Sequence, residues 1–234
     1  MSWSFTPDEF AHVWRETDLD RHPFPLRILE SARTEFQAAA LRREIETRLP
    51  LRADPDLSAC LRILAQPQTR VVAIGGRHEP GTEIRVLGAV VYDHAVLAVQ
   101  QPGFSPDYGG RVHLSIGHTS KLGARIAGLL PDTPPGHEPA RSAGADTVGD
   151  DEAVHTAEPP VRRIRKLLLQ PHTAEGHLRI ETELDQDPPA APVHYTWIDV
   201  ADDGRYLIRA DGQVHITPAS PQQIAAHLQK RILR

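Results

Sequence analysis

The order in which helix and strand patterns follow one another is the feature that most restricts how this chain can fold. After two leading helical patterns, the succession of one helix, four strands and one helix occurs twice, although the residues of the two copies do not match. Units of this kind bury their apolar faces against each other and form one continuous core. We therefore expect an α+β fold with a central antiparallel sheet, built from two pseudo-twofold-related halves and flanked by helical bundles.

The first half is expected to span residues 1–130. It opens with a short strand at 3–5, and Thr6-Pro7-Asp8-Glu9 has the capping-box pattern of a helix start. A second helix is expected over 32–49. The first copy of the repeat then begins with a helix at Asp54-Pro55, and its remaining elements are strands at 71–74, 84–92, 95–99 and 111–116 and a helix at 120–130.

The second half is expected over residues 161–234. Its pattern predicts a helix at 161–170, four strands that include 178–180, 193–200, 206–208 and 214–216, and a last helix that starts at Ser220-Pro221. Between the halves, residues 131–160 are acidic and rich in proline, glycine and alanine, and they follow neither apolar period. We expect this stretch to be a flexible connector.

Composition limits the classes of partner. The formal net charge of −5 disfavours binding to a nucleic-acid backbone or to an anionic membrane. No apolar run approaches the roughly 18–20 residues that a membrane-spanning helix requires, so no membrane insertion is expected. The sequence starts without the basic and apolar regions of a signal peptide, so the expected location is the cytoplasm. A monomeric state is compatible with the sequence.

No residue pattern indicates a catalytic or metal site. The single cysteine, Cys60, allows neither an intramolecular disulfide nor a cysteine metal site, and it is expected to be a small core residue. The 13 histidines lack HExxH spacing, and His113, His177 and His215 fall on the polar phase of alternating strands. We therefore predict no catalytic residue, no metal and no cofactor.

Other interpretations stay open at this point. One is a small hydrolase or metal-dependent enzyme with an unrecognised site, and another is a regulatory interaction domain. The basic run at 162–166 is either a contact for phosphate or an acidic partner, or the solvated face of an amphipathic helix whose apolar stripe is Val161, Ile164, Leu167 and Leu168.

Three stretches resemble the EspG family. The first is Trp3-Ser4-Phe5-Thr6 with Glu9-Phe10 and Val13-Trp14, followed by Pro23-Phe24-Pro25-Leu26. The second is the strand set from Val71 to Ile116 with its trailing helix. The third and most specific is Asp203-Gly204-Arg205-Tyr206-Leu207, followed by Val214, Ile216, Pro218 and a terminal helix.

The resemblance implies a cytosolic chaperone for type VII (ESX) secretion. Its partner would be a secreted helical protein or a PE–PPE-like heterodimer, whose exposed apolar tip the chaperone would shield. The resemblance also implies contacts from the loop between the second and third strands and from the adjoining sheet. Here that loop and its flanks are Gly76, Arg77, His78, Glu79, Pro80, Gly81, Thr82, Glu83 and Arg85.

Overall fold

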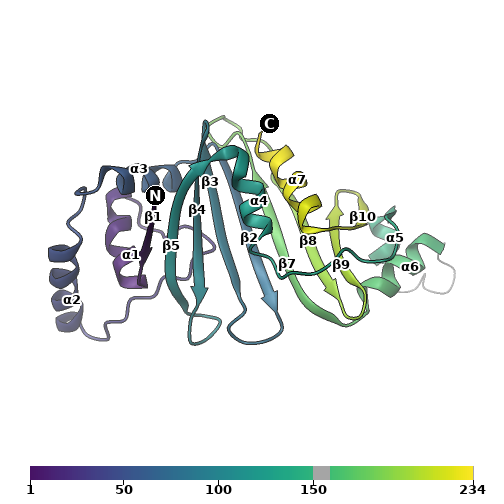
Figure 1. Cartoon of the computed structure of the whole chain (residues 1–234), viewed down its shortest axis with the longest axis horizontal. Helices are drawn as coiled ribbons and strands as arrows, with labels where there is room; N and C mark the ends of the chain where they lie inside the picture. The colour runs from purple at the N-terminus through teal and green to yellow at the C-terminus, as the bar shows by residue number, and fades with distance from the viewer. Residues whose placement is uncertain (150–158, 234) are drawn as a thin grey trace.

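A single long antiparallel sheet runs through the whole molecule. The computed structural model describes residues 1–149 and 159–233. The sheet has ten strands in the order β1-β5-β4-β3-β2-β7-β8-β9-β10-β6, and every neighbouring pair is antiparallel (Figure 1). An α+β fold with a central antiparallel sheet, expected from the sequence, is confirmed.

The strands fall into two meanders. One consists of β2 (Thr69–Arg77), β3 (Ile84–Val91), β4 (His94–Pro102) and β5 (Gly109–His118). The other consists of β7 (His172–Glu181), β8 (Val193–Val200), β9 (Gly204–Ala210) and β10 (Gln213–Pro218). The short strands β1 (Ser2–Phe5) and β6 (Arg141–Gly144) form the two outer edges. All eight strands of the expected repeat are present, and a pseudo-twofold relation between the halves stays a prediction.

The two meanders join where β2 pairs with β7. In this register Gly75 lies opposite Gly176. A Cβ on Gly176 would collide with the Ile74 carbonyl and with the Trp197 ring, which is fully buried. Glycine is therefore required at this position because the backbone of β2 and the indole of β8 approach it closely.

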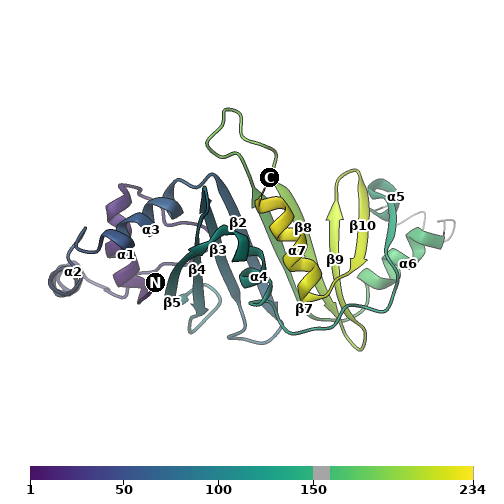
Figure 2. The same ribbon diagram turned by 45° about the horizontal axis from the view of Figure 1, so that its top comes forward.

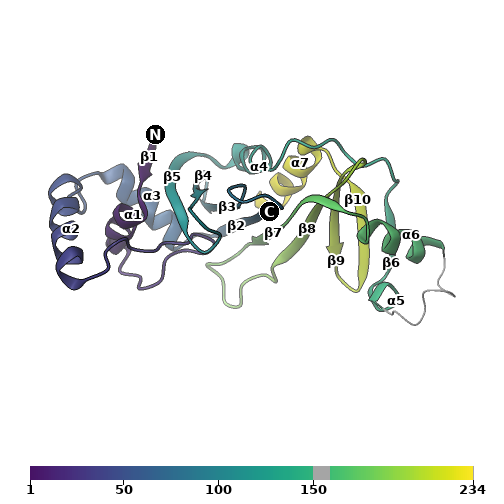
Figure 3. The same cartoon turned by 90° about the horizontal axis from the view of Figure 1, so that it is seen from below.

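Helices cover parts of both sheet faces (Figures 2 and 3). The helices are α1 (Pro7–Trp14), α2 (Glu35–Arg48), α3 (Pro55–Ala65), α4 (Leu122–Ala127), α5 (Ala145–Gly149), α6 (Pro159–Leu168) and α7 (Pro221–Ile232), with short 3-10 turns at Arg15–Thr17 and Thr119–Lys121. The apolar side chains of α4 and α7 share a core with Val71, Leu178 and Trp197 on one face of the sheet. On the opposite face, α1 and α3 pack over the first meander, and α6 packs over β8, β9 and β10.

Local side-chain signals set the helix starts. Thr6 and Glu9 form the expected capping box of α1, and Ser220 and Gln223 form that of α7. The Asp54 carboxylate caps α3. These three starts were predictable because each depends on a side chain that satisfies free N–H groups within its own first turn. The start of α2 was not, because this helix begins at Glu35 after the N-cap Thr34 and not at the expected residue 32.

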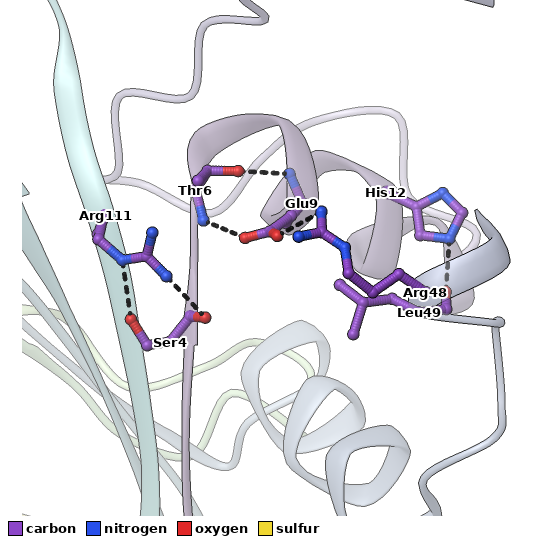
Figure 4. Close-up of polar contacts among 7 residues, drawn as sticks. All are labelled: Ser4, Thr6, Glu9, His12, Arg48, Leu49 and Arg111. Atoms are coloured by element: carbon purple, nitrogen blue, oxygen red, sulfur yellow. Dashed lines mark hydrogen bonds and ion pairs between the residues drawn. The ribbon is translucent and has the colours of Figure 1, made fainter. Parts of the chain in front are cut away.

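The first helices are tied together by polar contacts (Figure 4). Arg48 of α2 contacts the Glu9 carboxylate at 2.8 Å, so the capping residue of α1 also anchors α2. The imidazole of the buried His12 lies 2.9 Å from the Leu49 carbonyl. Arg111 of β5 donates to the Ser4 hydroxyl and carbonyl, which holds the edge strand β1.

The expected connector contains structure that its sequence did not predict. Within 131–160, β6 pairs with β10, with Gly144 opposite Gln213 and Arg141 opposite Ile216. Helix α5 follows β6 directly. Residues 141–149 thus form regular secondary structure within the expected connector, and the flexibility of the connector stays a prediction. The acidic residues Asp150, Asp151, Glu152 and Glu158 lie outside the described residues. In the described part of the chain, no helix is long and apolar enough to cross a membrane.

Candidate partner-binding surface

The loop singled out by sequence is the exposed tip of the β2–β3 hairpin. Arg77, His78, Glu79, Pro80 and Gly81 are exposed. The Thr82 hydroxyl lies 3.0 Å from the Arg77 carbonyl and 2.7 Å from the Glu79 carbonyl, so it closes the loop from within. At the base of the hairpin, a Cβ on Gly76 would meet the Thr82 carbonyl at 2.6 Å. The tip is thus a closed turn that presents a cation, an imidazole and a carboxylate to solvent.

The last two candidate residues lie below this tip. Glu83 is half-buried, and Arg85 is only 7% exposed. Burial lowers the pKa of the Arg85 guanidinium, and the nearby Glu83 carboxylate opposes that shift. Nη2 of Arg85 donates to the Pro106 carbonyl at 2.5 Å. Arg85 therefore supports the neighbouring β4–β5 loop from inside, and the structure does not place it on the exposed surface.

The β4–β5 loop carries an exposed aromatic side chain that the sequence reasoning missed. Phe104 is 82% exposed, and its ring lies 3.9 Å from the ring of Tyr108, centroid to centroid. The buried Gln100 fixes the base of the loop, because its side chain bonds both the N–H and the carbonyl of Arg27. An aromatic residue in Gly103-Phe104-Ser105-Pro106, a turn-forming stretch, was the available sequence signal.

A strip of sheet next to the hairpin carries polar side chains. It lies on the sheet face opposite α7, and we call it the polar stripe: Glu175, His177, Arg179 and Glu181 of β7, with His194 and Thr196 of β8. The His177 and Thr196 side chains lie 3.1 Å apart, and Arg179 donates to Glu181 at 3.0 Å. The stripe reaches the hairpin base, because Glu175 pairs with Gly76.

A hollow of about 340 Å³ lies between the polar stripe and the first helices. Arg70 and Arg179 line its sheet side. Leu19 and Phe24 line the other side, and they are exposed by 44% and 55%. Phe24 belongs to the Pro-Phe-Pro-Leu stretch that was noted in the sequence. The hollow therefore joins exposed apolar groups to the cations of the sheet.

The structure also shows the surroundings of the other residues considered in the sequence, Cys60 and the basic run of α6. Cys60 is fully buried, and burial raises the pKa of its thiol to about 12. In α6 the side chains of Val161, Ile164 and Leu167 are buried, whereas Arg162, Arg163 and Lys166 are exposed. The solvated-face interpretation of the basic run agrees with this arrangement. Among residues 1–149 and 159–233, no three His, Cys, Asp or Glu side chains are grouped so that they could hold a metal ion.

The Asp203-Gly204-Arg205-Tyr206 motif holds the start of the connector against β9. Arg205 is fully buried and donates from Nε and Nη2 to the two Asp199 oxygens at 2.6 and 2.7 Å. Its Nη2 also donates to the Pro131 carbonyl at 2.7 Å, and its guanidinium lies 5.0 Å from the centre of the Trp197 ring. These groups form a buried polar cluster, so the arginine of the motif has a structural role.

The tyrosine of the motif extends this cluster. The Tyr206 hydroxyl donates to the Asp203 carboxylate at 2.6 Å and accepts from the Glu138 N–H at 2.9 Å. Burial would raise the pKa of Asp203, but hydrogen bonds from Tyr206 and His137 lower it below its ordinary value. Burial and the Asp203 carboxylate together raise the pKa of Tyr206 to about 12.

Comparison with known proteins agrees with this architecture. The sequence pattern of the EspG family matches residues 6–230. No curated protein matches the sequence. Among solved structures, the chain is similar to the Mycobacterium tuberculosis type VII secretion system chaperone EspG5, solved in complex with a PE25–PPE41 dimer. The TM-score is 0.68 at 20% identity, over 100% of this chain and 96% of that chain. Because the family pattern covers nearly the whole sequence, this chain belongs to the EspG family.

Proposed function

We propose that this protein is a cytosolic chaperone of type VII secretion that binds a PE–PPE-type helical dimer. The observation that carries the proposal is the EspG family match over residues 6–230. The fold shared with EspG5, which was solved bound to a PE25–PPE41 dimer, supports the same partner class. We further propose that the chaperone shields an apolar tip of the dimer, which would otherwise favour self-association.

The proposed contact surface combines the β2–β3 hairpin tip, the polar stripe and the hollow beside it. Interfaces of this kind have an apolar centre and a polar rim. Leu19 and Phe24 supply exposed apolar groups in the hollow, and Phe104 supplies another on the β4–β5 loop. The hairpin tip from Arg77 to Gly81 and the polar stripe supply the charged and hydrogen-bonding rim. This arrangement suits a helical tip whose end is apolar and whose flanks are polar.

The test of function is binding by the unmodified protein. The full chain would be co-expressed with PE–PPE-type dimers and the mixture separated by size-exclusion chromatography. We expect one of the dimers to co-elute with the chaperone and to stay soluble only in its presence. Free elution of every dimer, with solubility independent of the chaperone, would refute the proposal.

The test of the surface uses aromatic substitutions in that complex. Phe24→Ala and Phe104→Ala each remove an exposed ring, and truncating an interface hot spot costs about 2 kcal/mol or more, roughly a thirtyfold loss of affinity. Phe36→Ala is the matched control, because Phe36 is 84% exposed on α2, outside the proposed surface. If both test variants bind like the wild type, or if the control is weakened equally, the surface is wrong although the chaperone function stands.

A further inference from the structure

A second hollow lies on the sheet face opposite the polar stripe, beside α7. We call it the α7 cavity; its volume is about 320 Å³, which is at the lower end of the range for small-molecule sites, about 300–1,000 Å³. Tyr195 of β8, Leu207 and Arg209 of β9 and His215 of β10 line its sheet side. His227, Lys230 and Arg231 line it from α7. The Tyr195 side chain points to one face of the sheet, and its neighbours His194 and Thr196, which belong to the polar stripe, point to the other. The α7 cavity is therefore separate from the proposed partner surface.

The lining of the α7 cavity is cationic. Arg209, Lys230 and Arg231 contribute positive charge, and no carboxylate lines the cavity among the residues that the structure describes. Asp211 lies outside the lining, 2.5 Å from Arg209 and 3.4 Å from His215, and holds both at the rim. In the described part of the chain, the Lys230 and Arg231 side chains form no ion pair, so their charge is available to a ligand.

The floor of the cavity carries an unused hydrogen-bonding group. Tyr195 is only 7% exposed, and its hydroxyl forms no hydrogen bond with any described residue. The hydroxyl oxygen is not buried, so it is open to solvent or to a ligand in the cavity that Tyr195 lines. Leu207 and Ala219 beside it are buried and apolar. The cavity thus joins an apolar floor, one free hydroxyl and two unpaired cations.

Helix electrostatics explains only part of this arrangement. Lys230 and Arg231 lie in the last turn of α7, where cations offset the negative end of the helix dipole. That role requires neither the apolar floor nor a tyrosine hydroxyl that opens into the cavity. Both features are instead typical of small-molecule sites, in which a few polar groups orient an otherwise apolar ligand.

We propose that the α7 cavity binds a small amphipathic carboxylate. The apolar body of the ligand packs on Leu207 and Ala219, its carboxylate pairs with Lys230 and Arg231, and the Tyr195 hydroxyl donates a hydrogen bond to it. This binding does not depend on the proposed chaperone function, because it requires only the free chain.

The experiment titrates the full-length protein with benzoate at pH 7 and low ionic strength, followed by calorimetry and by backbone amide resonances. Benzamide is the uncharged isostere, and inorganic phosphate is an anion without an apolar body. We expect saturable benzoate binding that shifts resonances of α7 and β9, with both comparison ligands about tenfold or more weaker. This follows because a hydrogen bond to a charged group contributes more than a neutral one.

Two variants and one control test the assigned residues. Lys230→Ala/Arg231→Ala should weaken benzoate binding about tenfold to hundredfold, and Tyr195→Phe about fivefold, the loss expected for one hydrogen bond. Arg163→Ala/Lys166→Ala removes the same charge from the exposed face of α6 and should leave binding unchanged. Lack of saturable binding at millimolar benzoate would overturn the proposal. So would equal binding of phosphate, equal losses in the control, or unchanged affinity in both test variants.

Discussion

Replacing Arg205 by methionine tests how strongly the stability of the fold depends on the buried ion pair between Arg205 and Asp199. Both side chains are essentially inaccessible, with relative exposures of 0% and 1%. Methionine keeps much of the side-chain length but removes the two N–H groups that the Asp199 oxygens accept. The carboxylate then keeps only the Thr133 hydroxyl, which donates to it at 2.8 Å.

The size of the effect follows from this geometry. Removing one partner of a buried ion pair costs about 3–5 kcal/mol, because the other charge stays desolvated and unpaired. Asp199→Leu should cost a similar amount, since it strands the Arg205 guanidinium. The double variant Arg205→Met/Asp199→Leu buries no charge. In the double variant the Thr133 hydroxyl and the Pro131 carbonyl lose their hydrogen-bond partners. Both residues are half-buried and reachable by water, so we expect the free energy of unfolding to fall by about 1–3 kcal/mol.

Urea unfolding, followed by tryptophan fluorescence and far-UV circular dichroism, measures the free energy of unfolding of the four proteins. The double variant should be more stable than either single variant. If its destabilisation instead equals the sum of the two single losses, then the two residues act independently and the charge-pair reasoning fails.

Three more outcomes follow from the structure. Gly176→Ala should lower the free energy of unfolding by more than about 2 kcal/mol, because its methyl group would strike the Ile74 carbonyl; an unchanged urea midpoint would contradict the close β2–β7 approach. The Cys60 thiol, fully buried and with a pKa of about 12, should react with a thiol reagent at pH 8 only after denaturation, and rapid labelling of the native protein would contradict its burial. Asp203 has a lowered pKa in the folded state, so its contribution to stability is present above the ordinary carboxyl pKa of about 4 and is lost as the pH falls below it. Tyr206→Phe should reduce this loss, and identical pH–stability curves for variant and wild type below pH 5 would show that Tyr206 does not stabilise the Asp203 carboxylate.

Much of the secondary structure could be predicted because its signals are local. The capping boxes at Thr6 and Ser220 fixed the starts of α1 and α7, and the strand expected at 193–200 has the bounds of β8. Strand β6 could not be predicted in this way. Its sequence, Arg-Ser-Ala-Gly, has no apolar alternation, and it is extended because the free edge of β10 supplies partners for its backbone.

The candidate surface was predictable only in part. The β2–β3 turn was readable from its glycines and proline, but the burial of Arg85 was not, because it depends on the Pro106 carbonyl of a separate hairpin. The hollow beside the polar stripe combines Leu19 and Phe24 with Arg70 and Arg179, which are far apart in the sequence. No local pattern predicts which of these groups face one another.

The sequence by itself determined the order of helices and strands outside the connector, the capping boxes of α1 and α7, and the face that each amphipathic element buries. These properties depend on periodicity and on side chains within one turn or one strand. Tertiary structure decided that the two meanders join at Gly75 and Gly176, that Arg205 is buried against Asp199, and that Tyr195 lines a cationic cavity beside α7. Such outcomes depend on backbones and charges that are distant along the chain, and they are set only when the sheet brings those groups into contact.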